Sequence, residues 1–509
     1  MKQRVRSELR KRKRQIEWRL ENAAPSADAG RPVLSSRRPH YEMAERTRAM
    51  PHGGIGAAHQ VVVQSGLIER IDAGLEVLKL HRPYHESDHV LNVAYNALCG
   101  GQTLDDIESR RNDEAYLDAL GAVAIPDPTT AGDFCRRFEG IHVELLMDII
   151  NEARLKVWER QGPEFVEATA RIDADGSMVP TTGGCKEGMA LSYKGLWGYH
   201  PLLVSFANTR EPLFIVNRSG NRPSSEGAAH YLDKAVALCR SAGFADILLR
   251  GDTDFSQTEH LDRWAEEGIR FVFGYDVRKN LKAQADSLPN AHYEELQRRA
   301  KRAFVEEDEC RIRPQQIKEE IVRAKGYKNI RLRSEDLAEF DYSPVACDRT
   351  YRMVVLRKNL TIERGEKALF DEIRYFCYIT NDRDLSAAEV VFEANDRCNQ
   401  ENLIEQLKNG VRVLHAPVNT LNANWAYMVM ASLAWTIKAW MALSLPVTPR
   451  WRKKHESERD AWMHMEFRTF LGAVLNMPAQ VTQSGRRLVI RLLAWRPQLP
   501  VFFRLLDAF

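Results

Sequence analysis

From about residue 165 the chain becomes a regular succession of short strand and helix patterns, and this limits the fold classes open to it. In the stretch 165–175, small apolar residues alternate with Thr169, Arg171, Asp173 and Asp175, which is the period of a half-buried strand. The next predicted elements are a hairpin at 198–217, a helix ending at Gly243, a strand at 247–249, a helix ending at Gly268 and a strand at 270–275. This strand and helix order predicts an α/β fold.

The rest of the 509-residue chain divides around this α/β part. Residues 1–60 carry most of the basic excess, with fourteen Lys/Arg against six Asp/Glu in the first fifty, and a Pro/Ser/Gly-rich middle. They are predicted to form a largely disordered basic arm, which suits a polyanionic partner but is equally typical of a solvated tail. Residues 61–160 are predicted to be helical, 277–370 to be an insertion that begins helical and turns strand-like, and 421–509 to be helical. The apolar stretch 425–445 contains Lys438 and is predicted to be a buried core helix, not a membrane span.

Acidic residues end two of the predicted strands. Asp173 and Asp175 lie on one face of the first strand, just before Gly176, and Asp252 follows the 247–249 strand and Gly251. The carboxyl ends of strands are where α/β folds build their sites. Taken singly, each acidic block is better explained as an Asp-containing turn.

A third block has helical spacing. At about 100° per residue, Arg397, Glu401 and Lys408 project from one narrow stripe beside an apolar seam. The alternative is a solvated Arg–Glu pair of little energetic value. No Cys or His pattern matches a zinc site.

Together these blocks resemble a known family. The spacing Arg-x3-Glu-x6-Lys is similar to the third block of bacterial insertion-sequence DDE transposases, in the branch marked by Tyr-x2-Arg-x3-Glu-x6-Lys. With GGCKEGMALSYKGLWGYHPLLVSFANTRE, LLRGDTDFS and RCNQENLIEQLKNGV, the chain resembles the insertion-sequence-1380 family over roughly residues 70–450. One position departs from the pattern: Ala394 stands where the family has Tyr, and its helical spacing from Arg397 predicts that it lies on the site face.

The resemblance implies a ribonuclease-H-like catalytic core, split into 161–276 and 371–420 by the insertion domain, with helical N- and C-terminal regions. By position, Asp175, Asp252 and Glu401 are the expected catalytic and metal-binding residues. Asp173 and Asp254 are their near competitors, and Asp276 is an outside candidate.

The chemistry expected from the resemblance suits these residue types. Mg²⁺ takes hard oxygen ligands, and two ions can activate the nucleophile and stabilise the leaving oxygen of a phosphodiester. We expect two Mg²⁺ ions, for which Mn²⁺ substitutes, and phosphate-holding roles for Arg397 and Lys408. Cut-and-paste excision through a hairpinned end is an expectation from the family branch.

The implied partners are the element's terminal inverted repeats and target DNA, bound by a homodimer in the bacterial cytoplasm, at the nucleoid, with no membrane. The helical region 61–160, with Arg136 and Arg137 on a basic helix, is predicted to bind DNA, although these helices fit any small bundle equally well. Two alternatives are a DNA-binding protein that has lost catalysis, which Ala394 favours, and a nuclease that cuts without rejoining.

Overall fold

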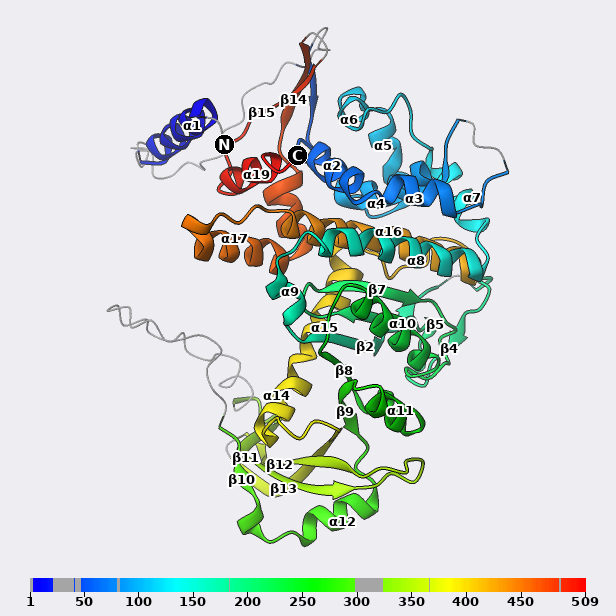
Figure 1. The fold of residues 1–509 in the computed structure, drawn as a ribbon, viewed down its shortest axis with the longest axis vertical. Coiled ribbons are helices and arrows are strands. Elements are labelled where there is room, and N and C mark those ends of the chain that lie inside the picture. The colour runs from blue at the N-terminus through cyan, green and yellow to red at the C-terminus, as the bar shows by residue number, and fades with distance from the viewer. Residues whose placement is uncertain are drawn as a thin grey trace.

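The computed structural model describes residues 3–21, 41, 47–79, 83–182, 184–297, 324–365, 367–484 and 487–509. Its central feature is a nine-stranded sheet of order β10-β11-β12-β13-β9-β8-β2-β6-β7 (Figure 1). Helices pack against one end of this sheet and beside its strands. The fold is therefore mixed α/β, as predicted.

Five strands form the part of the sheet that the sequence pattern predicted. They are β2 (Ala170–Gly176), β6 (Leu202–Phe206), β7 (Glu211–Val216), β8 (Ile247–Gly251) and β9 (Arg270–Tyr275). β2, β8 and β9 run parallel. β6 and β7 form the predicted hairpin, of which β6 pairs antiparallel with β2. The helices α10 (Ala228–Ser241) and α11 (Leu261–Glu266) connect β7 to β8 and β8 to β9. The parallel strands therefore end at one edge, where the acidic residues follow them.

Some helices and strands begin or end at other residues than predicted. The first strand begins at Ala170 and not at Phe165, because Pro163 opens a short helix, α9 (Pro163–Glu167). α10 begins after Gly227, whose φ is 73°, and ends at Ser241, two residues before the predicted end at Gly243. α11 follows two 3₁₀ turns, η2 (Thr253–Phe255) and η3 (Thr258–His260).

The predicted insertion extends the same sheet and is not a separate layer. β11 (Lys328–Tyr342), β12 (Tyr351–Arg364) and β13 (Lys367–Thr380) form a long antiparallel meander, and residues 377–380 of β13 pair with β9. The expected boundary at 370 is wrong, because it falls inside β13. The insertion is predicted to begin helical, and its residues 298–323 lie outside the described residues. The preceding elements are α12 (Lys279–Ser287), η4 (Asn290–His292) and β10 (Glu294–Glu295).

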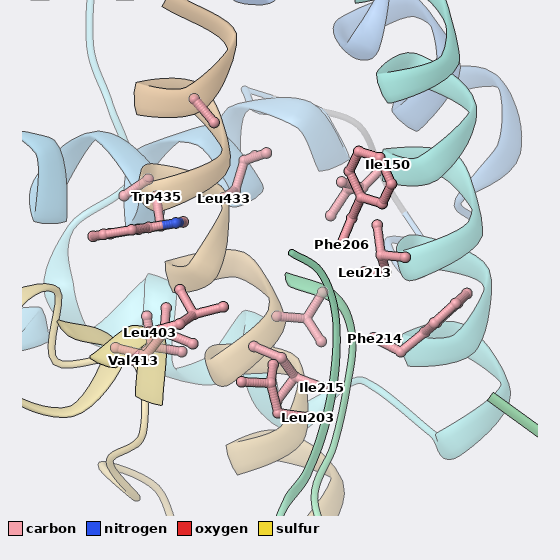
Figure 2. Packing of buried hydrophobic residues seen from close by; sticks show 14 of the residues in the cluster. Ile150, Leu203, Phe206, Leu213, Phe214, Ile215, Leu403, Val413, Leu433 and Trp435 are labelled. Atoms are coloured by element: carbon pink, nitrogen blue, oxygen red, sulfur yellow. The ribbon is translucent and has the colours of Figure 1, made fainter. Parts of the chain in front are cut away.

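A helical unit covers the β7 end of the sheet (Figure 1). It surrounds α16 (Leu421–Leu443), which contacts α2, α4, α7, α8 and β7. Its N-terminal elements are α2 (Ile55–Ser65), α3 (Leu67–Gly74), α4 (Glu86–Leu98), η1 (Leu104–Asp106), α5 (Ile107–Arg111), α6 (Glu114–Leu120), α7 (Pro128–Arg136) and α8 (Gly140–Trp158). Figure 2 shows Ile150 of α8, Phe206 and Leu213 of the sheet and Trp435 of α16 within one hydrophobic core. α16 alone is long and apolar enough to cross a membrane among the described residues, but it is buried inside the protein.

Both ends of the chain correct the sequence prediction. Within the arm expected to be disordered, α1 (Gln3–Glu21) is helical, supported by Arg12–Glu8 and Lys13–Glu17 pairs one turn apart. The C-terminal region is not all helical, since β14 (Ala479–Ser484) and β15 (Arg487–Leu492) form a hairpin that pairs with β1 (Arg48–Met50). Its helices are η6 (Pro449–Trp451), α17 (Arg452–His464), α18 (Phe467–Phe470), the π turn η7 (Leu471–Leu475) and α19 (Leu499–Leu506).

Lys438, the charged residue within α16, lies in the core. Its ammonium donates to the Met463 carbonyl at 2.8 Å and lies 4.1 Å from the centre of the Trp435 ring. Burial lowers its pKa to about 7. Between pH 7 and the ordinary lysine pKa, the unfolded chain therefore binds a proton that the folded protein does not, so the free energy of unfolding rises with pH across this window.

We expect Lys438→Met to increase the free energy of unfolding near pH 7–8 by about 1–4 kcal/mol, because it removes the cost of burying an amine that is charged in water. The same variant should flatten the rise of stability between pH 7 and 10. Urea unfolding of the wild type and of the variant at several pH values measures both the difference in the free energy of unfolding and its pH slope. An unchanged pH slope would show that the amine stays protonated in the core.

Candidate active site

The two aspartates of β2 face the same side of the sheet but have different surroundings. Asp173 is 1% exposed and accepts two hydrogen bonds from Arg250 of β8, from Nε at 2.6 Å and from Nη2 at 2.9 Å. Arg250 also pairs with Glu393 at 2.9 Å. Both carboxylate oxygens of Asp173 are thus engaged in a buried ion pair with Arg250.

Asp175 lies at the end of the same strand and remains accessible. One of its oxygens accepts a hydrogen bond from Nη1 of Arg397 at 3.2 Å. Burial raises the pKa of Asp175 to about 6; the Arg397 charge opposes this rise, and the Asp252 and Glu401 carboxylates add to it. Two of the predicted acidic residues, Asp252 and Glu401, therefore act electrostatically on the third, although the three come from separate elements.

Asp252 follows β8 directly. Its Oδ1 accepts a hydrogen bond from the Asp254 amide at 3.0 Å and caps the η2 turn. The preceding Gly251 has no room for a side chain, since a Cβ there would lie 2.5 Å from Phe255. Burial raises the pKa of Asp252, Arg397 lowers it, and Asp254 and Asp276 raise it further. Asp254, a competitor for the same role, is exposed, and Asp276, the outside candidate, directly follows β9.

The helix that carries the third block is not continuous, which corrects the straight-helix prediction. Ser386 caps α14 (Ala387–Asp396) as expected, but the chain turns at Arg397, and α15 (Cys398–Glu405) runs into the π turn η5 (Gln406–Gly410). Ala394, predicted to face the site, instead packs against the small core cluster around Val390 and Val391.

The interrupted helix still brings the basic and acidic groups of the third block to Asp175. Arg397 bonds to Asp175 directly, and Glu401 is solvent-exposed and acts on Asp175 through its charge. Burial lowers the pKa of Lys408, and the negative charge of Asp175 opposes that shift. A carboxylate cluster bordered by two cations can hold cations on its acidic side and phosphate on its basic side.

The donor set suits a hard divalent cation, because such ions prefer carboxylate oxygens, and an ion beside Asp175 would offset the Asp252 and Glu401 charges that raise its pKa. Nevertheless, across the described ranges no three Asp, Glu, His or Cys side chains stand close enough to share one metal ion. Arg397 is the cation paired with Asp175 in this arrangement. An ion would require the carboxylates to approach one another.

The site also contains residues that the sequence prediction missed. The His200 Nδ1 lies 2.8 Å from the Arg222 carbonyl oxygen, and its Nε2 would be 2.9 Å from a Cβ placed on Gly176. Gly176 therefore allows the imidazole to approach the end of β2. Burial lowers the pKa of His200. The signal was present in the quoted stretch that contains WGYHPLL, where His200 directly follows β5 (Trp197–Tyr199). β5 pairs with β3 (Val179–Pro180) and β4 (Ala190–Leu191).

Arg136 and Arg137, the predicted DNA-binding pair, lie elsewhere. They are at the end of α7, which packs against α4, α16 and η1 and is capped by Asp127, not by the expected threonine. Both arginines are exposed, and Arg136 pairs with Asp133 at 2.6 Å. The structure does not bring them to the acidic cluster.

Comparison with known proteins identifies the family of the chain. A piggyBac transposase synaptic complex with hairpin DNA, solved by cryo-EM, aligns over 84% of each chain at 10% identity with a TM-score of 0.37. A search of curated proteins returned no match. The model of the transposase DDE domain group 1 family matches residues 48–509, which include every element of the nine-stranded sheet and of the helical unit. The chain therefore belongs to the transposase DDE domain group 1 family.

Proposed function

We propose that the protein is an insertion-sequence transposase whose catalytic acids are Asp175, Asp252 and Glu401. The observation that carries this proposal is that Asp252, Glu401, Arg397 and Lys408 all interact with Asp175 at the end of β2, Arg397 by a hydrogen bond and the others through their charges. The sheet order β9-β8-β2-β6-β7, with Asp175 on the first core strand and Asp252 after the fourth, supports a ribonuclease-H-like core. Membership of the insertion-sequence-1380 family is part of this proposal.

In the proposed reaction, the three carboxylates would hold two Mg²⁺ ions, and these ions would supply activation of the attacking oxygen and stabilisation of the leaving oxygen. Arg397 then exchanges its contact with Asp175 for a phosphate oxygen, since guanidinium binds phosphate well. Lys408 offers a second positive charge from the π turn. Arg397 and Lys408 orient the scissile phosphate for attack by water. They afterwards orient the freed 3′-hydroxyl for its attack on target DNA.

The proposed partners are the terminal inverted repeats and target DNA, bound by a homodimer in the bacterial cytoplasm. Arg136 and Arg137 are proposed to contact DNA backbone outside the catalytic site, because both are exposed on α7. Hairpin formation at the excised end is proposed from the family branch alone.

Cleavage of a linear duplex that spans the end of the encoding element tests this proposal. With Mg²⁺ the wild type should cut at the element end, and Asp252→Asn and Glu401→Gln should bind the duplex but lose cutting by about 10³-fold, as loss of several kcal/mol of ion-based stabilisation implies. Arg349→Gln, in an exposed Arg349–Glu266 pair, is the control and should cut normally. Cutting that survives in both acidic variants would exclude these residues as catalytic.

A non-catalytic DNA-binding role is the second candidate. It is favoured by the Arg397–Asp175 contact, which already neutralises one acid, and by Ala394, which packs in a core cluster. Binding of the duplex by the wild type, with no cutting in Mg²⁺ or Mn²⁺, would establish this role.

A further inference from the structure

The N-terminal helix α1 concentrates positive charge far from the acidic site. It has eight Lys/Arg against three Glu in 19 residues, a net charge of +5. Arg12 and Lys13 pair with Glu8 and Glu17. Among the residues that the structure describes, no ion pair joins Arg6 or Arg10 to an acidic side chain, and both are exposed. These two arginines lie one helical turn apart and therefore on the same side of the helix.

The helix is attached to the folded body. Nη1 of Arg12 donates to the carbonyl oxygen of Leu492, the last residue of β15, at 2.7 Å, and Leu9 packs against the main hydrophobic core. These contacts turn the Leu9 side of α1 toward the protein. Arg6 and Arg10 consequently border the space between α1 and the C-terminal helices (Figure 1).

That space is a groove of about 1010 Å³ with walls from both ends of the chain. α1 contributes Arg6, Leu9, Arg10 and Lys13 to one wall. The other wall comes from the segment around α17 and α19, and its charged and aromatic members are Trp451, Lys454, His455, Glu458, Trp495, Arg504 and Asp507.

The groove is lined by more positive than negative side chains. Glu458 is already shared by Arg504 and by Lys454, the latter at 3.8 Å. Five cationic side chains thus face two acidic ones, and the acids lie on the C-terminal wall. The α1 wall attracts an anionic ligand, and Trp451, about half exposed, offers a flat apolar surface beside it.

We propose that α1 and this groove form a second DNA-binding surface, which holds backbone phosphates of the duplex outside the catalytic site. The proposal rests on the proposed function only in taking DNA as the substrate. Closely spaced phosphates match Arg6, Arg10 and Lys13, which repeat at about one helical turn along α1. An anionic membrane is disfavoured, because Leu9, which would have to insert into lipid, packs against the protein.

The test uses full-length protein without divalent metal and a duplex of arbitrary sequence, so that cleavage is not needed. Arg6→Gln/Arg10→Gln should bind about 10–100-fold more weakly at 50 mM salt, and the slope of log K against log salt should fall by about two, because two phosphate contacts are lost. The matched control is Arg240→Gln/Arg349→Gln, which removes two exposed arginines from surface pairs with glutamates of the α11 region. It should retain the wild-type slope.

Equal weakening of DNA binding in both double variants would overturn the proposal, since the effect would then follow from the change in net charge alone. A wild-type slope in Arg6→Gln/Arg10→Gln would overturn it as well. Binding of wild type, but not of this variant, to phosphatidylserine vesicles, with DNA binding unchanged, would assign the surface to a membrane instead. Failure of cleavage in Mg²⁺ would count against the proposed function and leave this result untouched.

Discussion

Asp175→Asn is expected to abolish metal-dependent DNA cleavage while leaving the protein folded and at least as stable as the wild type. The carboxylate is repelled by Asp252 and Glu401, and its pKa of about 6 shows that ionisation is unfavourable in the folded state. Stability therefore declines as the pH rises from the ordinary aspartate value through about 6, and the amide removes this cost of up to about 3 kcal/mol. Cleavage should fall by about 10³-fold, because a ligand of the ions is lost.

Asp173→Asn, two residues earlier on the same strand face, is the matched control and should behave in the opposite way. It removes the carboxylate from a pair in which Asp173 is 1% and Arg250 2% exposed. Breaking a buried pair by removing one partner costs about 3–5 kcal/mol, so this variant should unfold at lower urea concentration. Where it remains folded, its cleavage should stay within about tenfold of the wild type. If the two variants exchanged these phenotypes, the catalytic assignment would move to Asp173.

The sequence prediction was correct where the alternation of residues along a strand and the order of elements along the chain were enough to locate an element. The hairpin at 198–217 and the strand at 270–275 were located correctly, and Asp252 follows β8 as expected. The choice between Asp173 and Asp175 could not come from period, because residues two apart on a strand share a face. The choice depends on two arginines. The sheet register places Arg250 opposite Asp173. Arg397, at the turn between α14 and α15 and more than 200 residues further along the chain, bonds to Asp175.

Other features depend on tertiary contacts that no local pattern encodes. The turn at Arg397 and the π turn after Glu405 redirect a helix whose sequence has no Pro or Gly before Gly410, so an ideal periodicity misplaced Ala394. β14 and β15 were expected to be helical, but they form a hairpin, and β14 pairs with residues 48–50, over 400 positions earlier. The meander of β11 to β13 joins the core sheet through only the last four residues of β13.

Glu211 connects the helical unit to the catalytic sheet. It begins β7, and its carboxylate accepts hydrogen bonds from Nε of Arg154 at 3.0 Å and from the indole nitrogens of Trp158 and Trp440 at 3.2 and 2.9 Å. The first two donors belong to α8 and the third to α16. Glu211 and Arg154 are completely buried. The Arg154 guanidinium also donates to the Pro212 carbonyl at 2.8 Å.

Glu211→Ala should therefore lower the free energy of unfolding by about 3–5 kcal/mol, because it leaves the Arg154 charge buried without its counter-ion. The loss is a large fraction of the roughly 5–15 kcal/mol that typically holds a domain folded. The control is Arg154→Met/Glu211→Leu, which replaces both charges with apolar groups and should recover most of the loss, leaving the two indoles as its remaining cost. Urea unfolding of the two variants measures this difference. A double variant no more stable than Glu211→Ala would mean that the tryptophan hydrogen bonds, and not the ion pair, hold α8 and α16 on the sheet.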